Sequence, residues 1–319
     1  MINLKTSLLM LLFIAITGLC AAGEQKVYTA YKLSHPIMLD GTISSSAWQQ
    51  TIEAVGFKIL GSKSKGLATK QTGFRIAWDE EALYVAVRCE EPDMPKIQSK
   101  RKDGEALWGD DSIEIFLCPK YPAYDQLIVN TIGSKTWVNA VRNWAVAASR
   151  TQDSWTAEIR IPFAELGAVP KDGDTWRFNI ARNILTYDSG GERFSAWADV
   201  LTRFAEVENF AYLRFSKLTI SPDKAAAANC ESRMAIMRPA QESADLLLKK
   251  CSGKIENLKK YYPEKANDPN IYAFLQEIIS TRKLLDADIG SYSQVQFLCN
   301  KARNLAERIT AFEIKLLLE

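Results

Sequence analysis

The chain has 319 residues and a formal net charge of only +2, and without any long basic run it lacks the electrostatic footprint of a nucleic-acid-binding protein. Its 47% hydrophobic and 24% charged residues are typical of a globular protein, and its length is sufficient for two ordinary domains. Seven of the eight tryptophans fall between Trp48 and Trp176, which indicates that the two halves of the chain differ.

The first residues have the pattern of an export signal. A lysine precedes an apolar run at 8–16, and small residues follow at 18–23. The run is too short for a stable membrane span, so we predict a signal peptide over residues 1–22 and a secreted or periplasmic protein. A lipid anchor on Cys20 is the alternative, although the bulky leucine before it stands where a small residue is expected. No later segment is apolar enough to cross a membrane.

From about residue 26 to residue 221 the hydrophobic period is two. Apolar residues alternate with polar ones in short runs that are separated by turn residues. Roughly eight to ten such strands favour an all-β antiparallel sandwich over residues 26–221, with Trp78, Trp155 and Trp176 in its core. The clearest runs are Phe74–Trp78, Leu83–Val87, Ile113–Leu117, Trp155–Ile161 and Trp176–Ile180.

After about residue 222 the pattern becomes helical. We predict helices over about 231–251 and 270–285, and a last helix whose apolar residues recur at alternating steps of four and three, as in a heptad seam. Residues 222–319 are therefore expected to form a small antiparallel bundle, which either caps the sandwich or serves self-association or a protein partner. The seam residues are Leu298, Ala302, Leu305, Ile309, Phe312 and Leu316.

Removal of the signal would leave five cysteines, so at least one thiol stays unpaired. Cys251 and Cys299 could join two helices. Cys89 and Cys118 both end strand-like runs and could also pair, or the thiols remain free and buried. The sequence contains no C-x-x-C pair, and a zinc site of the usual spacing is not predicted.

The segment from Trp108 to Leu117 combines a flat aromatic surface with three carboxylates. A sugar suits such a segment, because its C–H groups pack on an aromatic face while its hydroxyls need carboxylate, amide or guanidinium partners. In an extended strand Trp108 and Glu114 would lie about 20 Å apart, too far to hold one ring. A turn at Gly109 is therefore required, and glycine permits it. Asp111 is expected to cap that turn.

The β region also carries a series of short motifs in a fixed order. In that order and spacing it resembles the carbohydrate-binding modules of family 9, within the wider group of DOMON-like β-sandwiches. The resemblance covers about residues 33–215 and implies two antiparallel sheets with a non-catalytic sugar site near one face or rim. The motifs are Pro36–Gly41, Ser46–Trp48, Ala77–Asp79, Leu83–Val87, Trp108–Leu117, Val129–Gly133, Trp155–Phe163, Trp176–Arg182 and Ser195–Trp197.

The resemblance also implies which residues would hold the sugar. In this family an aromatic pair sandwiches a pyranose ring while acidic and amide side chains bind its hydroxyls. The matching aromatic residues are Trp108 and Phe204, and the matching polar residues are Glu114 and Asn130. A basic residue is expected two positions before Asn130, where this chain has Ile128, so a charged hydrogen-bond donor is missing.

Two further candidates have alternative roles. Arg182 is either a strand-end arginine paired to an acid or a ligand contact. Trp197 is either a sugar platform or a residue packed behind one. Arg142, Arg182 or Arg193 could also supply the base that is absent at the isoleucine position.

We therefore predict non-catalytic binding of an oligo- or polysaccharide, in a protein that could assist polysaccharide-degrading enzymes. A glycoside hydrolase is the first alternative, but adjacent acids on one strand do not establish a catalytic cleft. A haem-binding domain is the second, with Met38, Met94 and His35 as the available ligands. The third is a structural or adaptor protein with a degenerate sugar site.

A structural calcium ion is considered for the acidic loop at 90–93. Calcium prefers carboxylate and carbonyl oxygens, but the sequence contains no dedicated twelve-residue calcium loop. No other cofactor is predicted.

Overall fold

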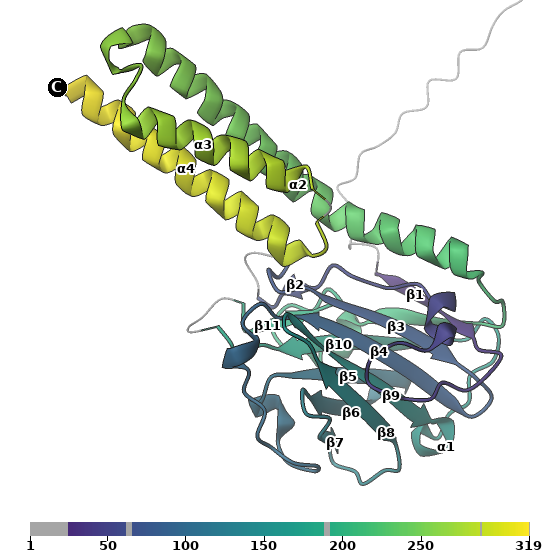
Figure 1. The fold of residues 1–319 in the computed structure, drawn as a ribbon. Helices are drawn as coiled ribbons and strands as arrows, with labels where there is room; N and C mark the ends of the chain where they lie inside the picture. The colour runs from purple at the N-terminus through teal and green to yellow at the C-terminus, as the bar shows by residue number, and fades with distance from the viewer. Residues whose placement is uncertain (1–24, 62–65, 188–191, 288, 319) are drawn as a thin grey trace, which may run out of the picture.

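The computed structural model describes residues 25–61, 66–187, 192–287 and 289–318. The signal peptide predicted at 1–22, including Cys20, lies outside these residues. The described chain forms a β-sandwich and three long helices that project from one end of it (Figure 1).

Twelve strands are described, somewhat more than predicted. They are β1 (Val27–Lys32), β2 (Lys58–Ile59), β3 (Thr72–Trp78), β4 (Ala82–Glu90), β5 (Ser112–Lys120), β6 (Ala123–Asn130), β7 (Lys135–Trp137), β8 (Ala145–Arg150), β9 (Ser154–Pro162), β10 (Thr175–Asn183), β11 (Phe194–Ala196) and β12 (Ala211–Ser216).

Hydrogen bonds join the strands in the order β7-β6-β5-β10-β12-β1-β3-β4-β9-β8, while β11 pairs with β10 and β2. This sheet curls into two layers, one containing β5, β6 and β10 and the other β3, β4 and β9 (Figure 1). Apolar side chains from both layers meet in one core. The core includes Trp78, Trp155 and Trp176, so their predicted burial is confirmed.

Strand β1 departs from the antiparallel pattern. It pairs in parallel with β12 on one side and with β3 on the other, whereas the other described strand pairs are antiparallel. A parallel neighbour needs a long connection, and the segment between β1 and β3 supplies it. β1 thereby joins the two layers along one edge.

The outer face of the β3-β4-β9 layer is covered by residues 33–50. Trp48, in the 3₁₀ turn η1 (Ser46–Gln50), is buried against this layer. Its indole N–H donates to Oε1 of Glu158 at 2.6 Å, and the backbone N–H groups of Asp40 and Gly41 donate to Oε2 at 2.8 and 2.7 Å. Glu158 is completely buried, so the segment closes this face.

The chain after the sandwich is helical, as expected. The first long helix extends beyond the predicted 231–251 at both ends, from Pro222 to Tyr261. Ser221 caps its start, and Pro222 occupies its first turn, where proline costs no hydrogen bond. The helices are α1 (Phe163–Leu166), α2 (Pro222–Tyr261), α3 (Pro269–Leu285) and α4 (Tyr292–Leu318), and the other 3₁₀ turns are η2 (Met94–Lys96), η3 (Leu107–Gly109), η4 (Val207–Asn209) and η5 (Pro263–Lys265).

Helices α2, α3 and α4 pack against one another as a three-helix bundle (Figure 1). The predicted heptad seam faces its interior. Five of its six residues are buried, and Phe312 packs against them at the edge.

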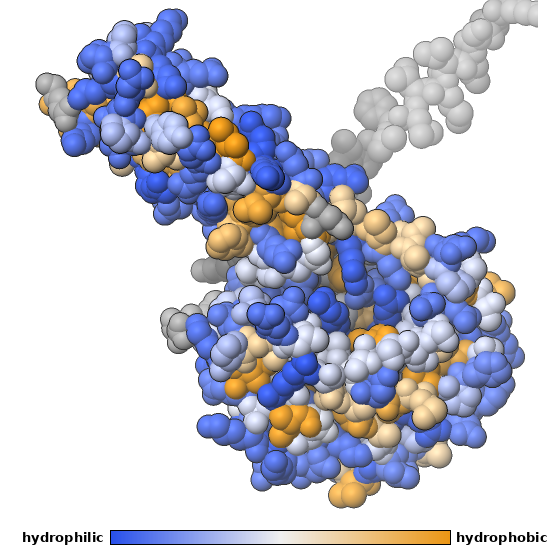
Figure 2. Space-filling view, viewed as in Figure 1, coloured by the Kyte–Doolittle hydropathy of each residue, from blue (hydrophilic) through white to orange (hydrophobic). Residues whose placement is uncertain are grey.

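The bundle is attached to the sandwich by polar and apolar contacts. The carboxylate of Glu90, at the end of β4, accepts the backbone N–H groups of Tyr292 and Ser293 at 3.3 and 3.2 Å, which caps the start of α4. Arg233 of α2 donates to Glu53 at 2.7 Å. Leu67 packs against an apolar cluster of the helices, and Figure 2 shows hydrophobic side chains gathered where the two parts meet.

The five cysteines in the described residues are free thiols, and Cys230 alone among them is exposed. None of the helices that the structure describes meets the length and hydropathy that a membrane span requires.

Candidate functional site

Trp108 lies on the turn that the sequence required. The turn η3 ends at Gly109, where the backbone N–H of Asp110 donates to the carbonyl of Leu107 at 3.0 Å. Glycine leaves room here for the Arg101 guanidinium group, because a Cβ atom at this position would lie 2.6 Å from the guanidinium carbon and would displace that side chain. The Trp108 side chain is left 51% exposed, so it offers a free aromatic face.

The loop before Trp108 is held by Asp110. Its Oδ2 atom accepts the backbone N–H groups of Lys100 and Arg101, both at 2.9 Å, and Arg101 adds an ion pair at 2.7 Å. Although burial opposes ionisation, these hydrogen bonds lower the pKa of Asp110. The carboxylate is therefore a structural anchor for the turn.

An open depression of about 750 Å³ lies beside Trp108. It runs over the edge strand β7, and its wall includes Thr136, Trp137 and Trp144. The exposed Arg142 also lines it, with its guanidinium 5.8 Å from the centre of the Trp137 ring. This depression places an aromatic face and a guanidinium group together, and Arg142 was one of three candidates for the missing base.

Glu114 lies on the central strand of the same layer. Its side chain points to the outer face of the layer and is only 5% exposed. Its cross-strand neighbours are Ile128 of β6 and Ala181 of β10. Gln126 donates to its Oε2 atom at 2.7 Å, and Asn183 donates to its Oε1 atom at 2.8 Å. Burial raises the pKa of the Glu114 carboxyl, with the two amide donors acting in the opposite direction.

Gln126, Glu114 and Asn183 form a row across three strands, which we call the polar row. Directly opposed residues of neighbouring strands share a face. Glu114 pairs with Ile128, and Ile128 pairs with Thr136, so these three residues lie on the outer face. Strand spacing puts the depression rim at Thr136 about 10 Å from Glu114. Gln126 and Asn183 could not be predicted from the sequence, since their link to Glu114 depends on strand pairing.

Phe204 lies in a loop beside β10 and β11, across this layer from the depression. It is partly buried, and its ring is 5.9 Å from that of Phe194, which is 43% exposed. Phe194 pairs with Asn183, so it shares the face of the polar row. The carbonyl of Phe204 accepts the side-chain amide of Asn179 at 3.0 Å, which fixes its loop to β10.

Glu206 also holds the Phe204 loop. Its carboxylate accepts the backbone N–H groups of Leu201 and Thr202 at 2.6 and 2.7 Å, and the side-chain amide of Asn209 at 3.1 Å. Burial alone would raise the pKa of Glu206, but these bonds outweigh it and lower the pKa to about 2. The loop is therefore tied down by a charged group.

Arg182 does not reach this face. Its side chain is completely buried, 3.2 Å from the carboxylate of Glu91, and it also donates to the carbonyl of Glu90 at 2.9 Å. Of the two roles considered, the structure places it as an arginine paired to an acid.

Asn130 and Trp197 are also held inside the fold. The Asn130 amide donates to the carbonyl of Arg101 and to Asp110, both at 3.0 Å, and its oxygen accepts the N–H of Ser134 at 2.9 Å. The Trp197 ring packs in the core, and its indole N–H donates to the carbonyl of Val55 at 3.1 Å. Neither side chain is brought together with Trp108 at the surface.

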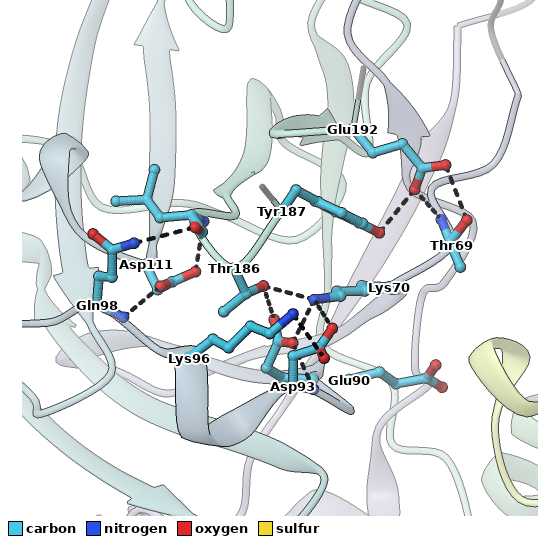
Figure 3. Close-up of polar contacts among 12 residues, drawn as sticks. Thr69, Lys70, Glu90, Asp93, Lys96, Gln98, Asp111, Thr186, Tyr187 and Glu192 are labelled. Atoms are coloured by element: carbon cyan, nitrogen blue, oxygen red, sulfur yellow. Dashed lines mark hydrogen bonds and ion pairs between the residues drawn. The ribbon is translucent and has the colours of Figure 1, made fainter. Parts of the chain in front are cut away.

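The acidic loop considered for calcium is paired with the ammonium group of Lys70, which comes from another segment of the chain. Lys70 Nζ lies 2.6 Å from Glu91, 2.9 Å from Asp93 and 2.6 Å from the hydroxyl of Thr186 (Figure 3). Within the described ranges no group of three acidic, histidine or cysteine side chains could hold a metal ion. The lysine therefore balances the charge of these carboxylates.

Asp111 does not cap the turn at Gly109, which Asp110 holds; it links two other loops of the same region. Its two oxygens accept the backbone N–H groups of Gln98 and Leu185, both at 2.8 Å (Figure 3).

Residues 39–210 match the family described as carbohydrate family 9 binding domain-like. The chain belongs to this family. The match spans nearly the whole β-sandwich and leaves α2, α3 and α4 outside it, so the family accounts for the part of the chain that carries Trp108 and the polar row. No curated protein matches the chain.

Three solved structures are similar to the sandwich. A family 9 module from Caldicellulosiruptor kristjanssonii in complex with cellotriose has 17% identity and a TM-score of 0.48, over 60% of this chain and 95% of that one. A putative carbohydrate-binding protein from Bacteroides uniformis has 18% identity and a TM-score of 0.48, over 60% and 100%. The C. kristjanssonii module in complex with glucose has 19% identity and a TM-score of 0.46, over 60% and 96%.

Proposed function

We propose that the β-sandwich binds carbohydrate without converting it, on the outer face of β5, β6 and β10. The observation that carries the proposal is the exposed Trp108, which lines a depression on the same layer as the polar row, in a chain that belongs to a carbohydrate-binding family. Trp108 would stack on one face of a sugar ring. Phe204, together with Phe194, would form the opposite wall.

Glu114 is the proposed acceptor for sugar hydroxyls. It is already held by two amides, so little ordering is needed when a ligand arrives. Each oxygen receives one of these amide donors and keeps further acceptor capacity for a hydroxyl.

Arg142 is proposed to replace the basic residue that the family pattern has at the position of Ile128. It is exposed in the depression that also contains Trp108, and a guanidinium group can donate to two hydroxyls at once. Arg182, Asn130 and Trp197 are left out of the proposed contacts, because Arg182 is paired with buried Glu91, Trp197 packs in the core and Asn130 is bonded to the loop before Trp108.

The test is a glycan array followed by calorimetric titration of each glycan that binds. Trp108→Ala should weaken binding about tenfold or more, because it removes the stacking surface. Tyr272→Ala is the control, since Tyr272 is an exposed aromatic residue on α3, away from the sandwich face. If Trp108→Ala binds as tightly as the wild type, the site is wrong. Absence of binding to any plant, microbial or host glycan would favour the adaptor hypothesis.

We also propose that the protein is exported, since residues 1–22 carry the pattern of a signal peptide. Sequencing of the mature N-terminus after expression in the native host should place the cleavage after Ala22 or Gly23. A mature protein that starts at Met1 would contradict export by this route.

A further inference from the structure

Three tyrosines and an arginine lie at the far end of the face that carries the polar row. Tyr121 lies in the turn between β5 and β6, Tyr124 on β6, Tyr212 on β12 and Arg177 on β10. We call this group the tyrosine platform.

The rings of the platform are fixed by their neighbours. The Arg177 guanidinium lies 4.8 Å from the centre of the Tyr121 ring and 5.5 Å from that of Tyr212. The carbonyls of Val207 and Glu208 accept hydrogen bonds from the same guanidinium at 3.1 and 2.9 Å. The arginine therefore holds both rings in place by cation–π contacts.

Tyr124 is held from below by the buried Phe116. The two ring centres are 5.9 Å apart, and Phe210 lies 6.2 Å from the Tyr124 ring. One side of Tyr124 is thus packed, while the side chain as a whole is 40% exposed and Tyr121 is 57% exposed. An aromatic ring that is already ordered loses little entropy when a ligand stacks on it.

The hydroxyl groups of the platform are not used by the fold. Within the described part of the chain, the hydroxyls of Tyr121, Tyr124 and Tyr212 have no hydrogen-bond partner. The buried tyrosines differ, since Tyr28 and Tyr84 donate to a carbonyl and a carboxylate at 2.6 and 2.8 Å. The platform therefore offers both apolar faces and free polar groups, as sugar recognition requires.

The platform continues the line of the proposed sugar site. Side chains alternate along a strand, so Tyr124, Gln126 and Ile128 all point to the outer face. Ile128 is opposite Glu114, and four residues along β6 correspond to about 13 Å between Tyr124 and the level of Glu114. This separation exceeds the width of one pyranose ring, whereas Trp108 lies toward the opposite end of the strands.

We propose that the tyrosine platform is a second sugar-binding subsite, so that the ligand is a linear oligosaccharide lying along β5 and β6. The inference rests on the proposed function, because one chain would be gripped by Trp108 and Glu114 at one end and by Tyr121 and Tyr124 at the other. A mono- or disaccharide would fill only the first of these subsites.

The test compares affinity with chain length. Cello-, xylo-, manno- and laminari-oligosaccharides of one to six residues are titrated into the wild type, the double variant Tyr121→Ala/Tyr124→Ala and Trp108→Ala. We expect affinity to rise with chain length in at least one series. The double variant should lose about three- to tenfold on the long members and nothing on the short ones. Trp108→Ala should lose affinity at every length.

A second variant separates ring loss from misfolding. Tyr121→Phe/Tyr124→Phe keeps both rings and should retain most of the dependence on chain length, and all variants should unfold near the wild-type temperature.

Three outcomes would decide between the inference and the proposed function. Binding that depends on Trp108 but not on chain length overturns the subsite alone. A double variant that binds the long members as the wild type does also overturns the subsite alone. Binding to none of the four series overturns the subsite, and absence of binding to every glycan on the array as well overturns the proposed function.

Discussion

The two outer faces of the sandwich place the same residue type in opposite settings. Glu158, on β9, is completely buried beneath residues 33–50 and receives one indole and two backbone N–H groups. Glu114, on β5, is held by two side-chain amides, with exposed aromatic residues on the same layer. One face is closed by the chain itself, and the other leaves its aromatic residues free for a ligand.

The comparison shows that the donors decide what a buried carboxylate can do. Backbone N–H groups cannot turn away, so those of Asp40 and Gly41 commit Glu158 to the fold. Gln126 and Asn183 bring one side-chain amide to each oxygen of Glu114, so both oxygens keep acceptor capacity. We therefore expect a ligand hydroxyl to share Glu114 but not Glu158, which lies beneath the covering segment.

Glu158→Ala should have the largest effect, because it leaves three donors without an acceptor, two of them buried. We expect the free energy of unfolding to fall by about 3–5 kcal/mol, measured by urea denaturation. Glu80→Ala is the control, since the ion pair of Glu80 with Lys32 lies at the surface and contributes less than about 1 kcal/mol. Equal unfolding midpoints for the two variants would show that Glu158 does not hold the covering segment.

Glu114→Ala should act mainly on binding. Loss of a charged acceptor is expected to weaken glycan binding about 10- to 100-fold, while the free energy of unfolding falls by only about 1–2 kcal/mol. The measurement pairs calorimetric titration with urea denaturation. A variant that is destabilised as much as Glu158→Ala, or that binds glycans normally, would remove the distinction between the two faces.

Glu206→Gln should loosen the loop that carries Phe204. Because folding lowers the pKa of Glu206 from 4.5 to about 2, the carboxylate stabilises the fold above about pH 4.5, and this contribution is lost as the pH falls toward 2. The variant should be about 1–2 kcal/mol less stable at neutral pH, with a smaller loss of stability on acidification. Thermal melting between pH 7 and pH 3 measures both effects, and parallel curves for variant and wild type would argue against this role.

Arg142→Ala should have the smallest effect. An exposed guanidinium contributes less than about 1 kcal/mol, so we expect glycan binding to weaken about two- to fivefold. Lys283→Ala, on the surface of α3, is the matched loss of charge away from the sandwich. If both variants bind equally well, Arg142 does not replace the base that is missing at Ile128.

Local patterns in the sequence predicted much of the fold. The period of two predicted the sandwich strands, and the heptad seam predicted the buried side of α4, because both signals depend only on neighbours along the chain. The turn at Gly109 followed from the reach of an extended strand. The parallel pairing of β1 could not be predicted, since it brings together residues far apart in the sequence.

The sequence alone determined the classes of the two halves and the core tryptophans, and it singled out Trp108 and Glu114 as the residues to test. Only the tertiary structure decided that Arg182 is buried against Glu91 and that Gln126 and Asn183 hold Glu114. The physical reason is strand register. The alternation of side chains predicts that successive residues of a strand point to opposite faces of the sheet. The pairing of strands decides which residues are neighbours on one face, and which face the rest of the chain covers.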